Sequence, residues 1–332
     1  MLIVGQSTVA HIMSKVPKVY IDGHVGTTGL RIRQWLSGRD DIELLTLPDE
    51  LRKDASVRRN QVQSSDVSIL CLPDDQSREA AAWVENESTR VIDASTAHRV
   101  VDRWVYGLPE LQPSQRDAIR TAKLVSNPGC YASAFVLLVR PLVDEGILPR
   151  DVSIVIHALS GYSGGGRSLI ERWEDPKRGL TSLPYEAPYA YGSLHKHIPE
   201  MTKYGGVSKQ PQFLPAVGPF RCGMRVQVPL HFDLLNEKAD GKKIWQVLDD
   251  RYQNEVFVDV VPLVDGSETD EQSFDPRSCN DTNRISIRML DHPSGHATLM
   301  AIQDNLGKGA CGMAIQSLNL MLDRPEETGL PV

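Results

Sequence analysis

The sequence predicts an α/β protein in which a parallel sheet of the nucleotide-binding type is followed by an α+β part. Short apolar, β-branched runs alternate with helical stretches in the N-terminal third, as in βαβ units whose sheet is covered on both faces. After residue 150, several runs alternate between apolar and polar positions, as in a largely antiparallel sheet. The chain has 332 residues, more than the roughly 250–300 that one core usually serves. Two domains are therefore expected.

The first βαβ unit begins at Lys18 with the sequence KVYIDGHVGTTGLRIRQWLSG. A β-prone run leads into a glycine-rich turn, and the apolar positions Leu30, Ile32 and Leu36 then predict a helix that ends at Gly38. Three further strands are predicted over 42–47, 66–73 and 90–95, with helical stretches such as 76–87 between them.

The second part begins with an amphipathic helix that starts at or beside Cys130 and ends at Gly146. Its apolar stripe consists of Ala132, Phe135, Val136, Val139, Leu142 and Val143. Later strands are predicted over 152–159, 224–232, 256–263, 284–290 and 297–303. A final helix over 308–322 carries small and apolar side chains along one side, namely Ala310, Met313, Ala314, Ser317 and Met321.

Composition limits the class of protein and of partner. The formal net charge is −7, which disfavours a polyanionic partner such as nucleic acid and favours a small molecule. No window approaches the roughly 20 apolar residues of a membrane-spanning helix. Five cysteines lie far apart without a CxxC pair, so neither a disulfide framework nor a zinc site is indicated, and a cytoplasmic location is expected. Residues 1–12 are interpreted as an extension, disordered or loosely attached, ahead of a second start at Met13.

The sequence GHVGTTG places Gly23, Gly26 and Gly29 between a strand and a helix. Glycine allows the backbone to approach a pyrophosphate, and a helix N-terminus attracts anions, so a dinucleotide cofactor is predicted; the alternative is a turn that is merely tight. Basic residues after the second strand favour a 2′-phosphate and hence NADP, although acidic ones compete and a charge run is usually a solvated face. These residues are Asp49, Glu50, Arg52, Lys53, Arg58 and Arg59.

Two later stretches carry further candidate groups. The sequence SGYSGGGRS, residues 160–168, follows a strand, and its backbone N–H groups with Arg167 can form a second anion site; the alternative is a surface loop. The sequence HKHIPEM places His195 and His197 two residues apart. No third ligand for a metal is indicated, so no metal site is predicted. The imidazoles are either surface residues or acid–base partners of a thiol.

Cys130 follows Asn-Pro-Gly directly and precedes the predicted helix. A lone cysteine is most often inert packing. At a helix N-terminus, however, unpaired N–H groups stabilise a thiolate, a histidine from the other part can accept its proton, and the same N–H groups can bind an acyl oxyanion. The position therefore favours a catalytic thiol over core filling.

Eight motifs in order resemble N-acetyl-γ-glutamyl-phosphate reductase, in its shorter subclass (type 2). They run from Lys18 to Leu322 and are GHVGTTG, DASTAHR, YGLPEL, SNPGCYA, SGYSGGGRS, HKHIPEM, VGPFRCGMRVQVPLH and DNLGKGACGMAIQSLN. The resemblance implies a Rossmann domain over 13–129 completed by 304–332. It also implies a substrate and oligomerisation domain of the semialdehyde-dehydrogenase type over 130–303, NADPH as reductant, and a homo-oligomer, either a dimer or a tetramer.

The resemblance also implies roles for individual residues. Cys130 would be the nucleophile, and His197, or alternatively His195, its acid–base partner. Cofactor contacts would come from Gly23, Gly26, Thr27, Thr28, Gly29, Ser95, Thr96, Gly164 and Asn305. Substrate contacts would come from Arg99, a candidate for the phosphate or carboxylate, together with Asn127 and Arg167.

The implied reaction belongs to arginine biosynthesis. A thiolate displaces phosphate from the acyl phosphate, hydride reduces the thioester, and the thiohemiacetal collapses to the semialdehyde. Related acyl phosphates (aminoadipyl or aspartyl) remain alternatives, as does a cysteine acyltransferase or hydrolase without nicotinamide chemistry. A catalytically silent nucleotide-binding protein is a third reading. Cys222 and Cys311 depart from the family pattern, which has Gln and Ala at these places; Cys222 is expected to affect packing near the site.

Overall fold

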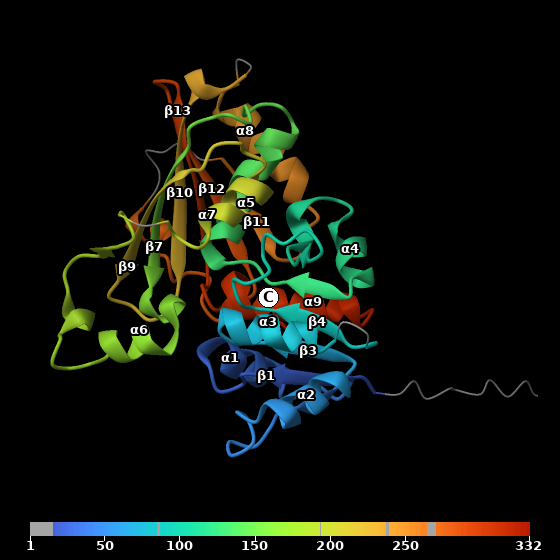
Figure 1. Ribbon diagram of the computed structural model, residues 1–332. Coiled ribbons are helices and arrows are strands. Elements are labelled where there is room, and N and C mark those ends of the chain that lie inside the picture. The colour runs from blue at the N-terminus through green and yellow to red at the C-terminus, as the bar shows by residue number, and fades with distance from the viewer. Residues whose placement is uncertain (1–15, 85–86, 193, 237–238, 264–269) are drawn as a thin grey trace, which may run out of the picture.

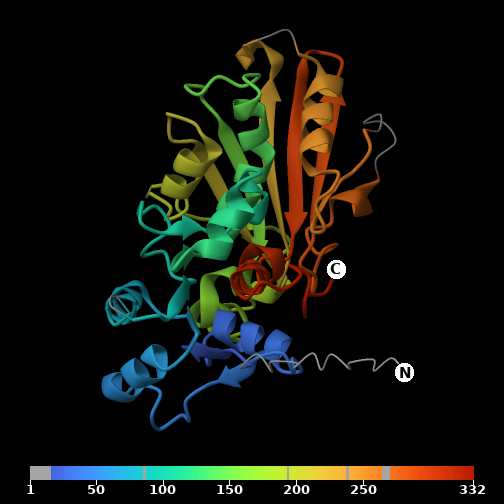
Figure 2. The same ribbon diagram turned by 90° about the vertical axis from the view of Figure 1, so that its right-hand side faces the viewer.

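The computed structural model describes residues 16–84, 87–192, 194–236, 239–263 and 270–332. The interpreted extension over 1–12 lies outside these residues. Two sheets organise the described chain, and each has its own layer of helices (Figures 1 and 2). No helix among the described residues is long and apolar enough to cross a membrane.

The first sheet is built from the N-terminal third of the chain. Its six strands run in the order β2-β1-β3-β4-β6-β5, and every pair in it is parallel. The strands are β1 Lys18–Asp22, β2 Glu43–Leu45, β3 Val67–Leu70, β4 Arg90–Asp93, β5 Val105–Tyr106 and β6 Leu124–Ser126. The parallel α/β prediction is thus confirmed. The short strands β5 and β6 were not predicted, because runs of two or three residues carry no periodicity.

Helices cover both faces of this sheet because successive strand residues face opposite sides. Val19 and Ile21 of β1 pack in one core, while Tyr20 between them packs in another. The first core also contains side chains of α1, α4 and the C-terminal α9, and the second contains those of α2 and α3. The helices are α1 Thr27–Leu36, α2 Ala55–Gln63, α3 Asp74–Ala82, α4 Gln115–Thr121 and α9 Gly312–Met321; a 3-10 turn, η1, covers Pro109–Leu111.

The second sheet has seven strands in the order β11-β12-β13-β10-β7-β9-β8. Most pairs are antiparallel, as predicted, but β7 pairs with β9 and β11 with β12 in parallel. The strands are β7 Val155–Gly161, β8 Ala187–Pro188, β9 Gln212–Gly218, β10 Met224–His231, β11 Val258–Val260, β12 Ile285–His292 and β13 His296–Gln303. The sequence prediction missed β8 and β9.

One face of the second sheet is covered by helices (Figure 1). The helices are α5 Cys130–Asp144, α7 Ile198–Gly205 and α8 Gly241–Tyr252. Along β10, Met224, Val226 and Val228 pack in the core under these helices, while Arg225 and Gln227 between them face the other side. On that other face, Met300 and Ile302 of β13 pack against Cys279 and Phe274.

The connections around the sheets carry the remaining elements. Helix α6, Gly166–Trp173, and the following loop pack with Tyr162 and with Val217 of β9 in a small apolar cluster around Trp173. A π-helical segment, η7, Gly307–Cys311, leads from β13 into α9 and brings the chain back to the first sheet. The other short turns are η2 Tyr162–Gly165, η3 Leu180–Ser182, η4 Phe232–Leu234 and η6 Glu271–Phe274. Both α5 and η7 therefore meet where the two sheets adjoin.

Candidate active site

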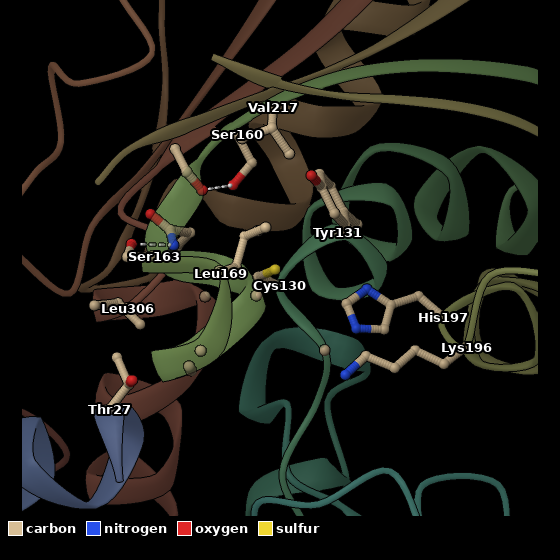
Figure 3. Close-up of a pocket in the computed structure, with 18 of the residues that line it drawn as sticks. Thr27, Cys130, Tyr131, Ser160, Ser163, Leu169, Lys196, His197, Val217 and Leu306 are labelled. Atoms are coloured by element: carbon tan, nitrogen blue, oxygen red, sulfur yellow. Dashed lines mark hydrogen bonds between the residues drawn. The ribbon is translucent and has the colours of Figure 1, made fainter. Parts of the chain in front are cut away.

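A cavity of about 610 Å³ lies where the two halves meet (Figure 3). Its walls come from the start of α1, the turn before α5, the start of α6, the segment before α7 and the chain after β13. The sequence-predicted residues that line it are Thr27, Thr28, Arg99, Asn127, Cys130, Gly164, His195, His197 and Asn305. These residues lie far apart in the sequence, so the fold assembles one site from them.

Cys130 is the first residue of α5, as its sequence position predicted. Gly129 before it is extended, with φ −80° and ψ 144°, and no side chain caps the helix. The buried Gln303 at the end of β13 donates from Nε2 to the Cys130 carbonyl at 2.8 Å. Gly309 lies so close that a Cβ there would be 2.8 Å from Cys130 Cβ. The nucleophile candidate is thus held from the second sheet and from η7.

Gly129 permits a close approach of two side chains. A Cβ on Gly129 would lie 2.6 Å from Arg99 Nη1 and would also meet the Nε2 of His197. The buried Glu200 accepts from the Gly129 N–H at 2.9 Å, from Arg99 Nη1 at 2.9 Å and from the Tyr106 hydroxyl at 3.0 Å. The turn before Cys130, the guanidinium and the imidazole therefore form one packed group.

Both candidate imidazoles are neutral at neutral pH. Burial, with the charges of Lys196 and Arg99, lowers the pKa of His195 to about 4. Burial, with the Arg99 charge, lowers the pKa of His197 well below its usual value. The backbone N–H of His197 donates to Nδ1 of the His195 ring at 3.2 Å. Nδ1 is therefore the acceptor, and the ring proton of His195 lies on Nε2. A neutral imidazole can accept a proton, and His197 lies nearer the turn that precedes Cys130.

The thiol of Cys130 is protonated in the free protein. Burial raises its pKa to about 11, although the charges of Arg99 and Lys196 and a backbone N–H act in the opposite direction. The helix N-terminus acts in the expected direction, but the desolvation cost of burial is larger than its effect on the pKa of the thiol. Deprotonation requires an acceptor, and the neutral imidazole of His197 lines the same cavity and approaches Gly129, the residue before Cys130.

The glycine-rich turn has the geometry of an anion site. Gly23 has φ +86°, and a Cβ on it would clash with the carbonyl oxygen of Cys71. A Cβ on Gly29 would clash with the carbonyl of Gly23, so only glycine fits at either place. The N-cap of α1, Gly26, offers no side-chain cap, which leaves the first N–H groups of the helix free. The residues present therefore fit the pyrophosphate of a dinucleotide.

The other predicted cofactor contacts differ among themselves. Gly164 and Asn305 line the cavity, and Asn305 is fixed by a bond from its Nδ2 to Ser163 at 2.9 Å. The hydroxyls of Ser95 and Thr96 instead donate to Asp93 and Asp74 and do not line the cavity. These two side chains hold their loop in place, and the structure does not bring their hydroxyls to the cavity.

Arg167 also lies away from the cavity. Its side chain is exposed and donates to Glu171 one turn later in α6, at 2.7 Å. Arg172 on the same helix lines the cavity instead. Sequence reasoning missed Arg172 and Lys196, as well as Glu200 and Gln303. The motif HKHIPEM contains two of the four, but their contacts depend on partners far away in the sequence.

The two departures from the family pattern lie at the edge of the site. Cys222 lies 3.4 Å from the Ser163 hydroxyl, next to the bond that fixes Asn305. Cys311 is buried, and its thiol donates to the Thr28 carbonyl at 3.4 Å. All five cysteines are free. Among the described residues, no group of three or more His, Cys, Asp or Glu side chains could hold a metal ion.

Comparison with known proteins agrees with this architecture. A family described as semialdehyde dehydrogenase, NAD binding domain, matches residues 18–120, and one described as semialdehyde dehydrogenase, dimerisation domain, matches residues 130–305. Aspartate semialdehyde dehydrogenase II from Vibrio cholerae, solved with ASA, superposes with a TM-score of 0.70 at 16% identity, covering 93% of this chain and 99% of the other. At that identity the likeness shows the fold.

Relatives with much higher identity share one name. N-acetyl-gamma-glutamyl-phosphate reductase 2 of Nostoc sp. is 46% identical over 319 residues, which cover 95% of this chain and 99% of that protein. The protein of the same name in Pseudomonas putida is 44% identical over 307 residues, covering 92% of this chain and 97% of that protein. The chain therefore belongs to the semialdehyde dehydrogenase family and, within it, to the N-acetyl-γ-glutamyl-phosphate reductases.

Proposed function

We propose that this protein reduces N-acetyl-γ-glutamyl phosphate to N-acetylglutamate semialdehyde with NADPH, releasing phosphate, as a step of arginine biosynthesis. The observation that carries the proposal is the placement of Cys130. Cys130 lies at a helix N-terminus and lines one cavity with the neutral imidazole of His197, and the same cavity reaches the start of α1. A nucleophile, a proton acceptor and a cofactor seat thus share one cavity, as the reaction requires.

Each step of the proposed reaction is assigned to residues of the cavity. His197 accepts the thiol proton, and the sulfur attacks the acyl carbon. The free N–H groups at the start of α5 stabilise the oxyanion that forms. Phosphate leaves and Cys130 carries the acyl group as a thioester. The protonated imidazole of His197 returns the proton when the C–S bond breaks and the aldehyde departs. The nicotinamide cofactor supplies the hydride that converts the thioester to the thiohemiacetal.

Cysteine suits this sequence better than serine. A thiolate attacks an acyl phosphate readily, and a thioester accepts hydride more readily than an ester does. The sulfur also leaves readily from the thiohemiacetal. The side chains of Asn127, His197 and Asn305 are buried in the wall of this cavity.

A preference for NADP over NAD is supported by the charges near the adenosine end of the site. His24 follows β1, and the charges of Arg33 and Arg52 help burial to lower its pKa, so both guanidinium groups lie near this turn. Arg58 is not available, because its ion pair with Asp22 at 3.0 Å is buried, whereas the ion pair of Arg52 with Asp49 at 3.5 Å lies at the surface. Arg52 and Arg33 are thus the cations we assign to the 2′-phosphate.

We assign the chain to a homo-oligomer, a dimer or tetramer, in the cytoplasm. The match to a dimerisation domain over residues 130–305 supports the assembly, and the face of the second sheet opposite α5, α7 and α8 carries the partly exposed Leu159 and Leu214. The five free cysteines support a reducing compartment. We assign residues 13–129 and 304–332 to the cofactor-binding domain and residues 130–303 to the substrate domain. The C-terminal segment is assigned to the first domain because α9 packs on the first sheet.

The test is the reverse reaction: phosphate-dependent reduction of NADP⁺ with N-acetylglutamate semialdehyde. The expected result is turnover that needs phosphate and that disappears in Cys130→Ala. No turnover overturns the proposed activity, and higher kcat/KM with aspartate or aminoadipate semialdehyde reassigns the substrate. Hydrolysis of an acyl substrate without nicotinamide identifies a hydrolase. Turnover that survives in Cys130→Ala overturns the role of the thiol.

A further inference from the structure

Three cationic side chains line the cavity, and they differ in how their charge is compensated. Arg99 is buried and paired with the carboxylate of Glu200, so its charge is largely offset. Arg172 and Lys196 make no ion pair among the described residues of the chain. Two cations therefore remain for an anionic ligand, and neither was assigned a role by the sequence.

Lys196 is the one that lies beside the reacting groups. It lies between His195 and His197 in the sequence. In Figure 3 the Lys196 side chain runs alongside the His197 ring, and its amine points toward the cavity. The Lys196 charge lowers the pKa of both imidazoles and opposes the rise in the pKa of the Cys130 thiol. Arg172 reaches the cavity from α6 and is not among the charges that act on these groups.

The reaction places a large negative charge at this point. As the sulfur attacks the acyl carbon, the C–O bond to phosphate breaks and the electron pair leaves with the phosphate oxygen. His195 stays neutral. In the proposed reaction His197 holds the thiol proton at this stage, which is one positive charge against a leaving phosphate that carries at least two negative charges. Arg99 can donate N–H groups, but Glu200 offsets its charge. A further cation in the cavity stabilises this leaving group, and Lys196 is the unpaired cation that lies beside the reacting groups.

We infer that Lys196 binds the phosphate group of the acyl phosphate and of the released product, an inference that rests on the proposed function. Its flexible stem and compact ammonium suit a leaving group that moves away from the acyl carbon as the bond breaks. Lys196 is exposed, so its replacement leaves the core of the protein unchanged. Nearby Asp74 feels the Lys196 charge but accepts its hydrogen bonds from Thr96.

The reverse reaction isolates this contact because phosphate is then a separate substrate. Cys130 first adds to the aldehyde to give the thiohemiacetal. Its hydroxyl proton passes to His197 and its hydride to NADP⁺, which leaves the thioester. A phosphate oxygen next attacks the thioester carbon, the C–S bond breaks, and the sulfur leaves as thiolate. Only the attack of phosphate on the thioester uses the contact with Lys196. A defect in this step can therefore be distinguished from a defect in hydride transfer.

The experiment compares Lys196→Met, Lys196→Arg and Arg172→Met with the wild type at varied inorganic phosphate. For Lys196→Met we expect the KM for phosphate to rise roughly 10- to 100-fold, the range for a lost hydrogen bond to a charged group. The KM values for the aldehyde and NADP⁺ should change less than about threefold. Lys196→Arg should recover most of the phosphate affinity, because it restores a cation.

Arg172→Met is the matched control, since it removes one positive charge from the same cavity. If it raises the KM for phosphate as much as Lys196→Met does, the effect is a general field and the inference is overturned. An unchanged KM for phosphate in Lys196→Met overturns it as well. If the KM for phosphate stays high in Lys196→Arg, the contact does not depend on the positive charge, and the inference is overturned.

A single-turnover measurement completes the test. Without phosphate, enzyme, aldehyde and NADP⁺ should give a burst of NADPH as the thioester forms, and Lys196→Met should retain its amplitude and rate. A burst slowed in parallel with turnover would show that Lys196 acts on the thiol, contrary to the inference. Failure of the proposed function is distinguishable, because the wild type itself would then show neither burst nor phosphate-dependent turnover.

Discussion

Gly129→Ala tests whether the turn before Cys130, the imidazole of His197 and the guanidinium of Arg99 form one packed group. The backbone at Gly129 has φ −80° and ψ 144°, which alanine adopts without strain. The substitution therefore adds one methyl group to the site and leaves the turn conformation allowed. Its effects come from what the methyl group meets.

The size of the effect follows from the contacts. The added Cβ would be 2.6 Å from both Arg99 Nη1 and His197 Cδ2, whereas ordinary contact begins at 3.4 Å. Both side chains must therefore retreat by roughly 1 Å, or Cys130 must move away from them. A misplacement of about 1 Å costs roughly 100-fold in the rate of a positioned reaction, so we expect kcat to fall by about that factor.

The assay is the steady-state reverse reaction together with thermal unfolding. Gly38→Ala is the control, because a Cβ there meets nothing within 4 Å. The control should keep full activity and gain at most about 1 kcal/mol in the free energy of unfolding. A Gly129→Ala enzyme with kcat within about threefold of wild type would refute the packed-group geometry.

Three further predictions concern other groups. Because burial raises the pKa of the Cys130 thiol to about 11, its alkylation rate by iodoacetamide should climb about tenfold per pH unit from pH 7 to 10; a plateau near pH 8 would contradict this. Arg52→Ala should raise the KM for NADPH roughly tenfold with little change for NADH, measured by cofactor titration. Lys308→Met leaves its fully buried partner Glu110 unpaired and should cost about 3–5 kcal/mol in urea unfolding, whereas adding Glu110→Gln should recover part of that loss.

The sequence was sufficient to predict those elements and turns whose conformation depends on residues that are close together in the chain. Alternation of apolar runs with helical stretches predicted the parallel sheet, and the position of Cys130 after Asn-Pro-Gly predicted the start of α5. The glycines of the first turn were predicted because their backbone requirement lies within one strand–turn–helix unit. The short strands β5, β6 and β8 escaped prediction because pairing partners, not periodicity, define them.

Charge states could not be read from the sequence, because burial is a property of the assembled fold. The helix N-terminus suggested a thiolate at Cys130, but the surrounding core raises the pKa of the thiol. Arg58 was grouped with cations near the cofactor, but it is committed to Asp22 inside the first half. Each outcome depends on neighbours that the local sequence does not contain.

Local sequence patterns were enough to identify a two-part α/β chain with a glycine turn for a dinucleotide and a cysteine at a helix start. Which side chains contact one another depends on how the two parts pack. Glu200 bonds to Gly129 across 71 residues of chain, and Gln303 bonds to the Cys130 carbonyl across 173. Such contacts form when two sheets and their helices pack against each other. The packing of the two parts therefore brings Lys196 into the same cavity as Cys130, whereas the sequence pattern alone was enough to identify Cys130.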